Sequence, residues 1–136
     1  MAHARHRVWA PVPPKPVSPD ATEKTAIIDA CETFIATVLK PRFLPSIEPT
    51  EFHYMVDIHG EWRAGRYRFM RRYRSGFPEN TGMEFDAPFA RIDRMGPDRF
   101  DIYWMRHTGT WYRLHTGKTF AETLHILETD GVLFPY

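Results

Sequence analysis

Polar and apolar residues alternate between residues 51 and 59, and this pattern limits the fold more than any other feature of the chain. The apolar members are Phe52, Tyr54, Val56 and Ile58, and the polar members are Glu51, His53, Asp57 and His59. A period of two is typical of a half-buried strand in an antiparallel sheet. Gly60 and Glu61 then predict a turn, and residues 62–74 predict the return strand, with a bulge near Gly65.

Apolar residues at spacings of three and four predict a helix before this hairpin. They are Ile27, Ile28, Cys31, Phe34, Ile35 and Val38. The segment Asp20-Ala-Thr-Glu23 places an acid at each end of a cap-like sequence, which favours a helix start there. Pro41 predicts the end of the helix, because proline has no backbone N–H.

Three more strands and a second helix are predicted on the C-terminal side. The strands are residues 88–94, 100–106 and 110–115, and they follow a loop at 75–86. Thr119-Phe-Ala-Glu122 is a capping box that opens a helix ending near Thr129. We therefore expect an α+β fold: an N-terminal helix, a curved antiparallel sheet of about five strands (a hairpin plus a three-stranded meander) and a C-terminal helix.

Length and composition indicate one folded domain behind a basic arm. A chain of 136 residues can bury a single core, and we assign that domain to residues 20–136. Residues 1–19 contain five prolines and three basic residues, so we expect a disordered, Pro-rich basic arm.

No apolar run suits a signal peptide or a membrane span, so we expect a cytoplasmic protein without a membrane partner. Cys31 lies among apolar residues, which predicts a buried thiol.

The strongest local charge lies in residues 63–74, which we call the arginine strip. The strip holds six arginines and no acid, whereas the whole chain has a net charge of +1. On a strand, alternate residues share a face at a spacing of ~6.6 Å, which suits a phosphate backbone. The arginines that share a face are Arg66, Arg68, Arg72 and Arg74. The aromatic residues of the strip point to the other face, unlike those of sheet-surface RNA binders.

A solvated face, or one paired inside the fold, is the alternative explanation of the strip. Arginines on one strand can be neutralised by acids on the neighbouring strands. The acids considered for this role are Glu51, Asp57, Asp93 and Asp101.

A histidine-containing group is the candidate metal site. His53, Asp57 and His59 share the polar face of the first predicted strand. Asp57 and His59 are close enough to hold one ion, whereas His53 is roughly 13 Å from Asp57 along the strand. The remaining histidines lack a nucleophile or a phosphate-binding motif beside them. We therefore expect no catalytic residue and no cofactor.

The apolar C-terminal segment is a candidate partner-binding surface. It contains Val132, Leu133, Phe134 and Tyr136. Such a segment either folds back onto the core or, if it is exposed, forms a docking strand for a protein partner or a second copy of the chain.

Several motifs resemble those of a known family. They are Pro88-Phe-Ala-Arg-Ile92, Phe100-Asp-Ile-Tyr-Trp-Met-Arg106 and Gly109-Thr-Trp-Tyr112, followed by a helix and Phe134. The sequence resembles a family of short bacterial proteins catalogued as a domain of unknown function, and the similarity covers roughly residues 24–134. The resemblance implies one compact domain, and it supplies no activity and no site residues.

The sequence leaves three functions open, in this order. The first is a non-enzymatic interaction module that binds nucleic acid through the four arginines that share a face. The second is a protein-binding accessory factor, which uses the C-terminal segment or a sheet edge and includes self-association. The third is a small metal-dependent or hydrolytic enzyme built on His53, Asp57 and His59.

Overall fold

A computed structural model describes residues 15–136. Its helical segments are α2 (Ala21–Phe34), a π-helical turn (Ile35–Leu39), α3 (Lys40–Phe43) and α4 (Phe120–Thr129), with short 3₁₀ turns at Pro78–Asn80 and Gly131–Leu133. Its strands are β1 (His53–Arg63), β2 (Arg66–Ser75), β3 (Glu84–Gly96), β4 (Arg99–Met105) and β5 (Trp111–Lys118). The predicted α+β fold is confirmed. None of the described helices is long and apolar enough to cross a membrane.

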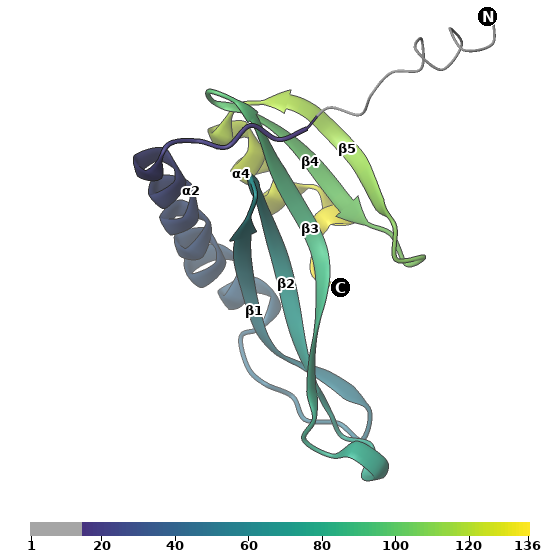
Figure 1. Ribbon diagram of the computed structural model, residues 1–136. Coiled ribbons are helices and arrows are strands. Elements are labelled where there is room, and N and C mark those ends of the chain that lie inside the picture. The colour runs from purple at the N-terminus through teal and green to yellow at the C-terminus, as the bar shows by residue number, and fades with distance from the viewer. Residues whose placement is uncertain (1–14) are drawn as a thin grey trace, which may run out of the picture.

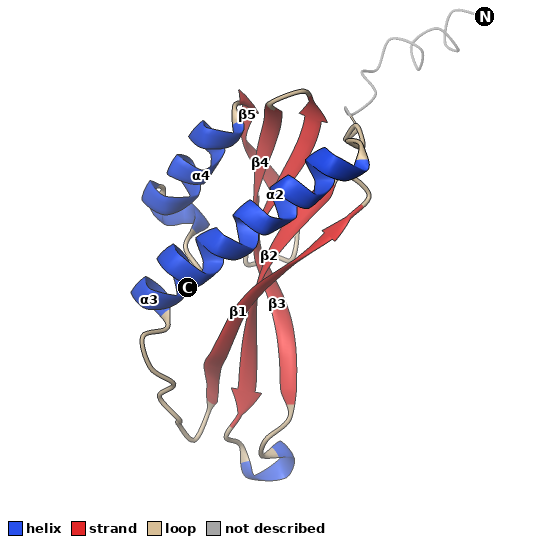
Figure 2. Cartoon of the chain, turned by 90° about the vertical axis from the view of Figure 1, so that its left-hand side faces the viewer, coloured by secondary structure: helices blue, strands red, loops and turns tan. Residues whose placement is uncertain are grey.

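The five strands form one sheet in the order β1-β2-β3-β4-β5, and each strand runs antiparallel to the next. Both long helices, α2 and α4, lie on one side of this sheet (Figures 1 and 2). We call the other side the open face. The ends of β1, β2 and β3 extend past the helices as a ribbon, with the 3₁₀ turn at Pro78–Asn80 at its tip (Figure 2).

The core lies between the helices and the sheet. It is built from apolar residues of every layer: Ile27, Cys31 and Phe34 of α2, Tyr67, Phe69, Ile92, Phe100 and Ile102 of the sheet, and Leu127 and Leu133 of the C-terminal part. The helical period predicted several of these inward-facing positions, among them Ile27, Cys31 and Phe34, because burial on one side imposes that period. In contrast, the polar residues between them in β2 turn toward the open face.

The first helix begins as predicted but extends beyond Pro41. The Asp20 side chain accepts the Glu23 amide at 2.8 Å and caps α2. After Phe34 the helix widens into the π turn, in which the Lys40 amide donates to the Ile35 carbonyl. Pro41 then falls in the first turn of α3. The first amides of a helix need no partner inside it, so proline is tolerated there and the predicted end was wrong.

The first hairpin turns at Ala64-Gly65, not at Gly60-Glu61. Ala64 and Gly65 have φ values of 52° and 82°, the signs required by a type I′ hairpin turn. Gly60 instead lies inside β1 opposite Phe69, where a Cβ would overlap the buried ring of Tyr67. Glycine is needed here to make room for an aromatic ring. The predictions of a turn at Gly60 and a bulge near Gly65 were therefore wrong.

A bulge between Met55 and Asp57 changes the phase of the alternation in β1. Tyr54 is paired with Arg74 and lies before the bulge, whereas Ile58 is paired with Arg71 and lies after it, fully buried. The extra residue of a bulge moves all following side chains to the opposite face. The prediction that Tyr54 and Ile58 share one apolar face is corrected accordingly.

Arg94 connects the first described residues to the sheet. Its guanidinium donates to both oxygens of Glu23 at 2.8 and 2.9 Å and to the Val17 carbonyl at 3.0 Å. The Val17 amide in turn donates to the Arg94 carbonyl at 2.7 Å. Most of the predicted arm, residues 1–14, lies outside the described residues.

Candidate functional site

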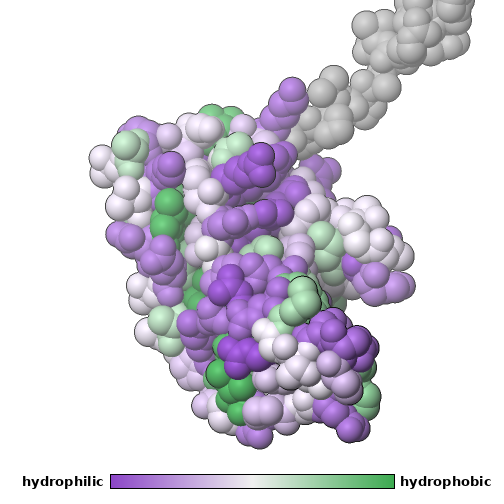
Figure 3. Space-filling model, turned by 60° about the horizontal axis from the view of Figure 1, so that its bottom comes forward, coloured by the Kyte–Doolittle hydropathy of each residue, from purple (hydrophilic) through white to green (hydrophobic). Residues whose placement is uncertain are grey.

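Residues 66–74 of the arginine strip lie on β2, in the interior of the sheet, and Arg63 is the last residue of β1. Tyr67 and Phe69 are buried beneath the helices, so Arg66 and Arg68, which alternate with them, lie on the open face. Arg72 and Arg74 follow on the same face, opposite Asp86 and Glu84 of β3. Figure 3, which views the molecule obliquely from below, shows hydrophilic residues gathered along the middle of this side.

All four arginines that were predicted to share a face have a cross-strand carboxylate partner. The pairs are Arg66 with Asp93 (3.3 Å), Arg68 with Glu61, Arg72 with Asp86 (2.9 Å) and Arg74 with Glu84 (2.8 Å). Internal pairing was the alternative considered for the strip. Of the acids then considered, Asp93 takes this role, and the other three partners were not foreseen.

The pairs toward the ribbon are balanced. Arg72 donates to both oxygens of Asp86, at 2.9 and 3.2 Å. This hydrogen bonding lowers the pKa of Asp86 and raises the pKa of Arg72. The hydrogen bond to Glu84 likewise raises the pKa of Arg74. Each guanidinium here has its own carboxylate, so this end of the strip carries no local excess of positive charge.

Guanidinium groups outnumber carboxylates at the opposite end of the strip. Arg63, Arg66, Arg68 and Arg91 line a hollow of about 340 Å³ on the open face, together with Ala64 and Trp111. We call it the arginine hollow. Among residues 15–136, its four guanidinium groups have ion-pair partners in only two carboxylates, Glu61 and Asp93. Arg63 has no ion-pair partner within this part of the chain.

Asp93 holds two of these arginines in place. Its side chain is 2% exposed, and it accepts from Arg66 at 3.3 Å and from Arg91 at 2.8 and 3.1 Å. The Arg91 guanidinium carbon also lies 4.0 Å from the ring centre of Tyr103 and 5.0 Å from that of Trp111. Charge-assisted hydrogen bonds and ring contacts restrict the rotamers of Arg91. The hollow is therefore formed before any ligand arrives.

Strand register aligns the surrounding groups in a row across the sheet. Successive paired positions from β1 to β5 are Glu61, Arg68, Arg91, Tyr103 and Arg113. Neighbouring strands are ~4.8 Å apart, so this row spans roughly 19 Å. It brings aromatic and basic groups onto the same face. This juxtaposition could not be predicted from the sequence, because Tyr103 reaches the strip only through the pairing of β2, β3 and β4.

A family model described as Domain of unknown function (DUF3024) matches residues 18–135. The chain belongs to this family. The match confirms the resemblance, which the sequence motifs suggested over roughly residues 24–134. No curated protein and no solved structure matches the chain. For this DUF3024 domain, a function must therefore be argued from the chemistry of its own site.

The DUF3024 domain does not bring the three candidate metal ligands together. His53 packs between the rings of Phe77 and Phe85, with centroid distances of 5.0 and 4.9 Å. Asp57 pairs with Lys40 at 2.9 Å, and Nε2 of His59 lies 3.2 Å from Asp86. Within residues 15–136, no three His, Cys, Asp or Glu side chains are grouped closely enough to hold a metal ion.

The C-terminal segment packs mainly onto the DUF3024 core. Leu133 is 1% exposed. The rings of Phe134 and Phe43 pack in a tilted arrangement with their centres 4.9 Å apart, and the Arg42 guanidinium lies 4.5 Å from the centre of the Phe134 ring. Val132 and Tyr136 remain 45% and 81% exposed. Two of the four predicted partner-binding side chains are thus available at the surface.

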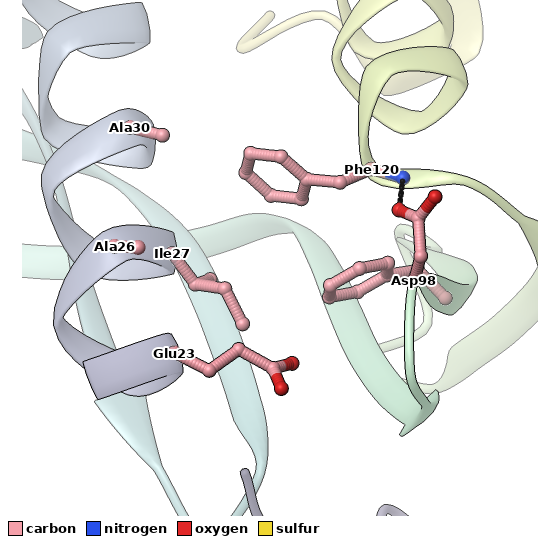
Figure 4. Close-up of a pocket in the computed structure, with 7 residues that line it drawn as sticks. Glu23, Ala26, Ile27, Ala30, Asp98 and Phe120 are labelled. Carbon is pink, nitrogen blue, oxygen red and sulfur yellow. Dashed lines mark hydrogen bonds between the residues drawn. The ribbon is translucent and has the colours of Figure 1, made fainter. Parts of the chain in front are cut away.

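An apolar cleft of about 370 Å³ separates the N-terminal part of α2 from the start of α4 (Figure 4). Its two carboxylates are already engaged, since Glu23 accepts from Arg94 and Asp98 accepts the Phe120 amide at 2.8 Å.

Cys31 is fully buried as predicted, and burial raises the pKa of its thiol to about 12. A protonated, inaccessible thiol cannot act as a nucleophile.

Proposed function

We propose that this domain is a non-enzymatic binding module that holds single-stranded nucleic acid on its open face, centred on the arginine hollow. One observation carries the proposal: four guanidinium groups face two carboxylates around a concave surface that includes an indole. Guanidinium groups bind phosphate oxygens in charge-assisted pairs, and nucleobases stack on aromatic rings. The hollow supplies both kinds of contact.

The proposed site differs from the four arginines first identified in the sequence. Arg66 and Arg68 remain in it, and Arg63, Arg91 and Trp111 join them. Arg72 and Arg74 contribute less, because their carboxylate partners Asp86 and Glu84 already neutralise them.

Trp111 favours a single strand over a duplex. Its ring lines the hollow, where it can stack on a base only if that base is unpaired and accessible. In a duplex the base faces are covered by their neighbours, so the ring would add little to binding. A single strand can place phosphates on the arginines and a base on the indole at the same time.

Two matched double variants test the proposal. Arg63→Gln/Arg68→Gln removes two charges from the hollow, and Arg72→Gln/Arg74→Gln removes two charges from the balanced end of the same strip. We expect the first to weaken binding of a short fluorescent oligo-dT or oligo-U about tenfold or more, and the second to change it by about threefold at most. Anisotropy titrations between about 50 and 200 mM salt should give a slope of about −2 to −3 for three or four phosphate contacts.

The control is stringent because it leaves two carboxylates, Asp86 and Glu84, without their arginine partners. If binding depended only on net charge, the control would lose at least as much affinity as the hollow variant. That outcome would show that the arginine hollow is not the binding site. The absence of oligonucleotide binding by the unaltered protein at low salt would refute the proposal, and binding of heparin alone would assign the hollow to another polyanion.

A further inference from the structure

Arg71 lies on the opposite side of the sheet from the strip arginines just described. It is paired in register with the fully buried Ile58 of β1 and with Ala87 of β3, and it shares a face with Phe69 two residues before it. Its side chain therefore emerges on the helix side. The role of Arg71 must be sought there, away from the arginine hollow.

A second hollow surrounds this side chain. It has a volume of about 460 Å³, and the residues that matter for its chemistry are Arg71, Trp104, Met105, Arg106, His107 and Tyr136. They come from β2, from the end of β4 and the turn after it, and from the C-terminal segment. We call it the Arg71 hollow. Its volume lies within the range of roughly 300–1,000 Å³ that is usual for small-molecule sites.

The charge of the Arg71 hollow is uncompensated within the described chain. No acid lines it, and neither Arg71 nor Arg106 forms an ion pair with a carboxylate of residues 15–136. This contrasts with the arginines on the open face of β2, which have carboxylate partners. Two fixed positive charges therefore face the same concave space.

The Nε atom of Arg71 is buried and has no hydrogen-bond partner among the described residues. A buried donor without a partner is rare and unfavourable. The guanidinium carbon of Arg71 lies 5.7 Å from the ring centre of Tyr73, a contact that does not satisfy this N–H. The Arg71 guanidinium also lines the hollow, so an anion there can accept from its terminal N–H groups.

The remaining walls are apolar or aromatic. Trp104 and Met105 are half-buried, Tyr136 is exposed, and the Arg106 guanidinium carbon lies 6.0 Å from the ring centre of Trp104. We propose that the Arg71 hollow binds a small organic anion, a flat and largely apolar molecule that carries a carboxylate or phosphate group. Arg71 and Arg106 bind the anionic group, and Trp104 and Tyr136 contact the apolar body.

Three related probes test this site by isothermal titration calorimetry: 2-naphthoate, 2-naphthyl phosphate and the neutral 2-naphthamide. At least one anion should bind with a dissociation constant in the micromolar to millimolar range, and the amide should bind about tenfold more weakly or not at all. The ratio of the two anion affinities identifies the preferred anionic group. Arg71→Gln and Arg106→Gln should each weaken anion binding about tenfold, while the matched variant Arg74→Gln should leave it unchanged.

Several results would overturn the inference: equal affinity for the amide, no anion binding at millimolar concentration, or equal losses in Arg74→Gln. If Arg71→Gln does not fold, the anion affinity of Arg106→Gln tests the site instead, because Arg106 is exposed. The inference does not rest on the proposed nucleic-acid site. Arg63→Gln/Arg68→Gln should therefore keep its naphthoate or naphthyl phosphate affinity, and loss of that affinity would contradict the existence of a separate Arg71 site.

Discussion

At the scale of single residues, the arginines of β2 differ in what lies beside them rather than in their own chemistry. Arg72 faces a carboxylate that binds it at two points. Arg68 shares its surroundings with Arg91, the residue opposite it on β3, and Arg71 points to the other side of the sheet. A guanidinium that is fully paired holds strands together, whereas one in excess can bind an external anion.

The Arg72–Asp86 pair makes stability depend on pH in a defined direction. The hydrogen bond from Arg72 lowers the pKa of Asp86 below its ordinary value of 3.8. A lowered folded-state pKa stabilises the protein above the unfolded-state value, and this contribution is lost as pH falls through the folded-state value. We expect Asp86→Asn to be less stable than the unaltered protein near neutral pH, with the difference shrinking below a pH of about 4.

Urea unfolding of both proteins at several pH values checks this prediction. Other carboxylates titrate in both proteins, so the quantity to follow is the difference in the free energy of unfolding. A difference that stays constant from neutral pH into strong acid would show that the charge of Asp86 plays no part in it.

At the scale of elements, the first hairpin depends on the space above Gly60. A methyl group at this position would overlap the buried Tyr67 ring, which cannot move aside in a packed core. We expect Gly60→Ala to lower the free energy of unfolding by about 1–3 kcal/mol, as measured by urea denaturation.

Gly96→Ala is the matched control, since a Cβ at residue 96 would have no contact closer than 4.0 Å, to Nε of Arg99. It should change stability by about 0.5 kcal/mol or less. Equal losses in the two variants would show that the cost comes from the backbone alone, and that the Tyr67 ring is not the reason for glycine at residue 60.

The same elements show what the sequence could and could not predict. The helix and strand periods predicted both long helices and all five strands, because each period follows directly from burial on one side. The position of the hairpin turn was not predictable from Gly60, since its role depends on an aromatic ring on the partner strand. The helix end predicted at Pro41 was wrong for a similar reason. The apolar spacing does not show the π turn that precedes this proline.

At the scale of the whole molecule, the arginine hollow could be located only once the strand register was known. Glu84 and Asp86 fall in the predicted loop 75–86, but β3 begins at Glu84 and places both acids opposite Arg74 and Arg72. The sequence therefore identified the charged strip but not which part of it keeps an excess of charge. Trp111 was equally hidden, because it reaches the arginine face only through the meander of β3, β4 and β5.

The fold divides its surfaces into regions with different chemistry. Most of the helix side of the sheet is buried in the core. The Arg71 hollow lies on this side, beside the C-terminal segment. The open face carries balanced ion pairs toward the ribbon and the arginine hollow toward the Ala64-Gly65 turn. Nucleic-acid binding should accordingly be confined to one end of the open face.

Arginine side-chain NMR measures this confinement directly, since each Nε–Hε group gives its own signal. On titration with oligo-dT or oligo-U, we expect the signals of Arg63, Arg66, Arg68 and Arg91 to shift together with the Trp111 indole signal. Those of Arg71, Arg72 and Arg74 should stay in place. Uniform shifts across the strip, or shifts restricted to Arg72 and Arg74, would contradict the arginine hollow as the binding site.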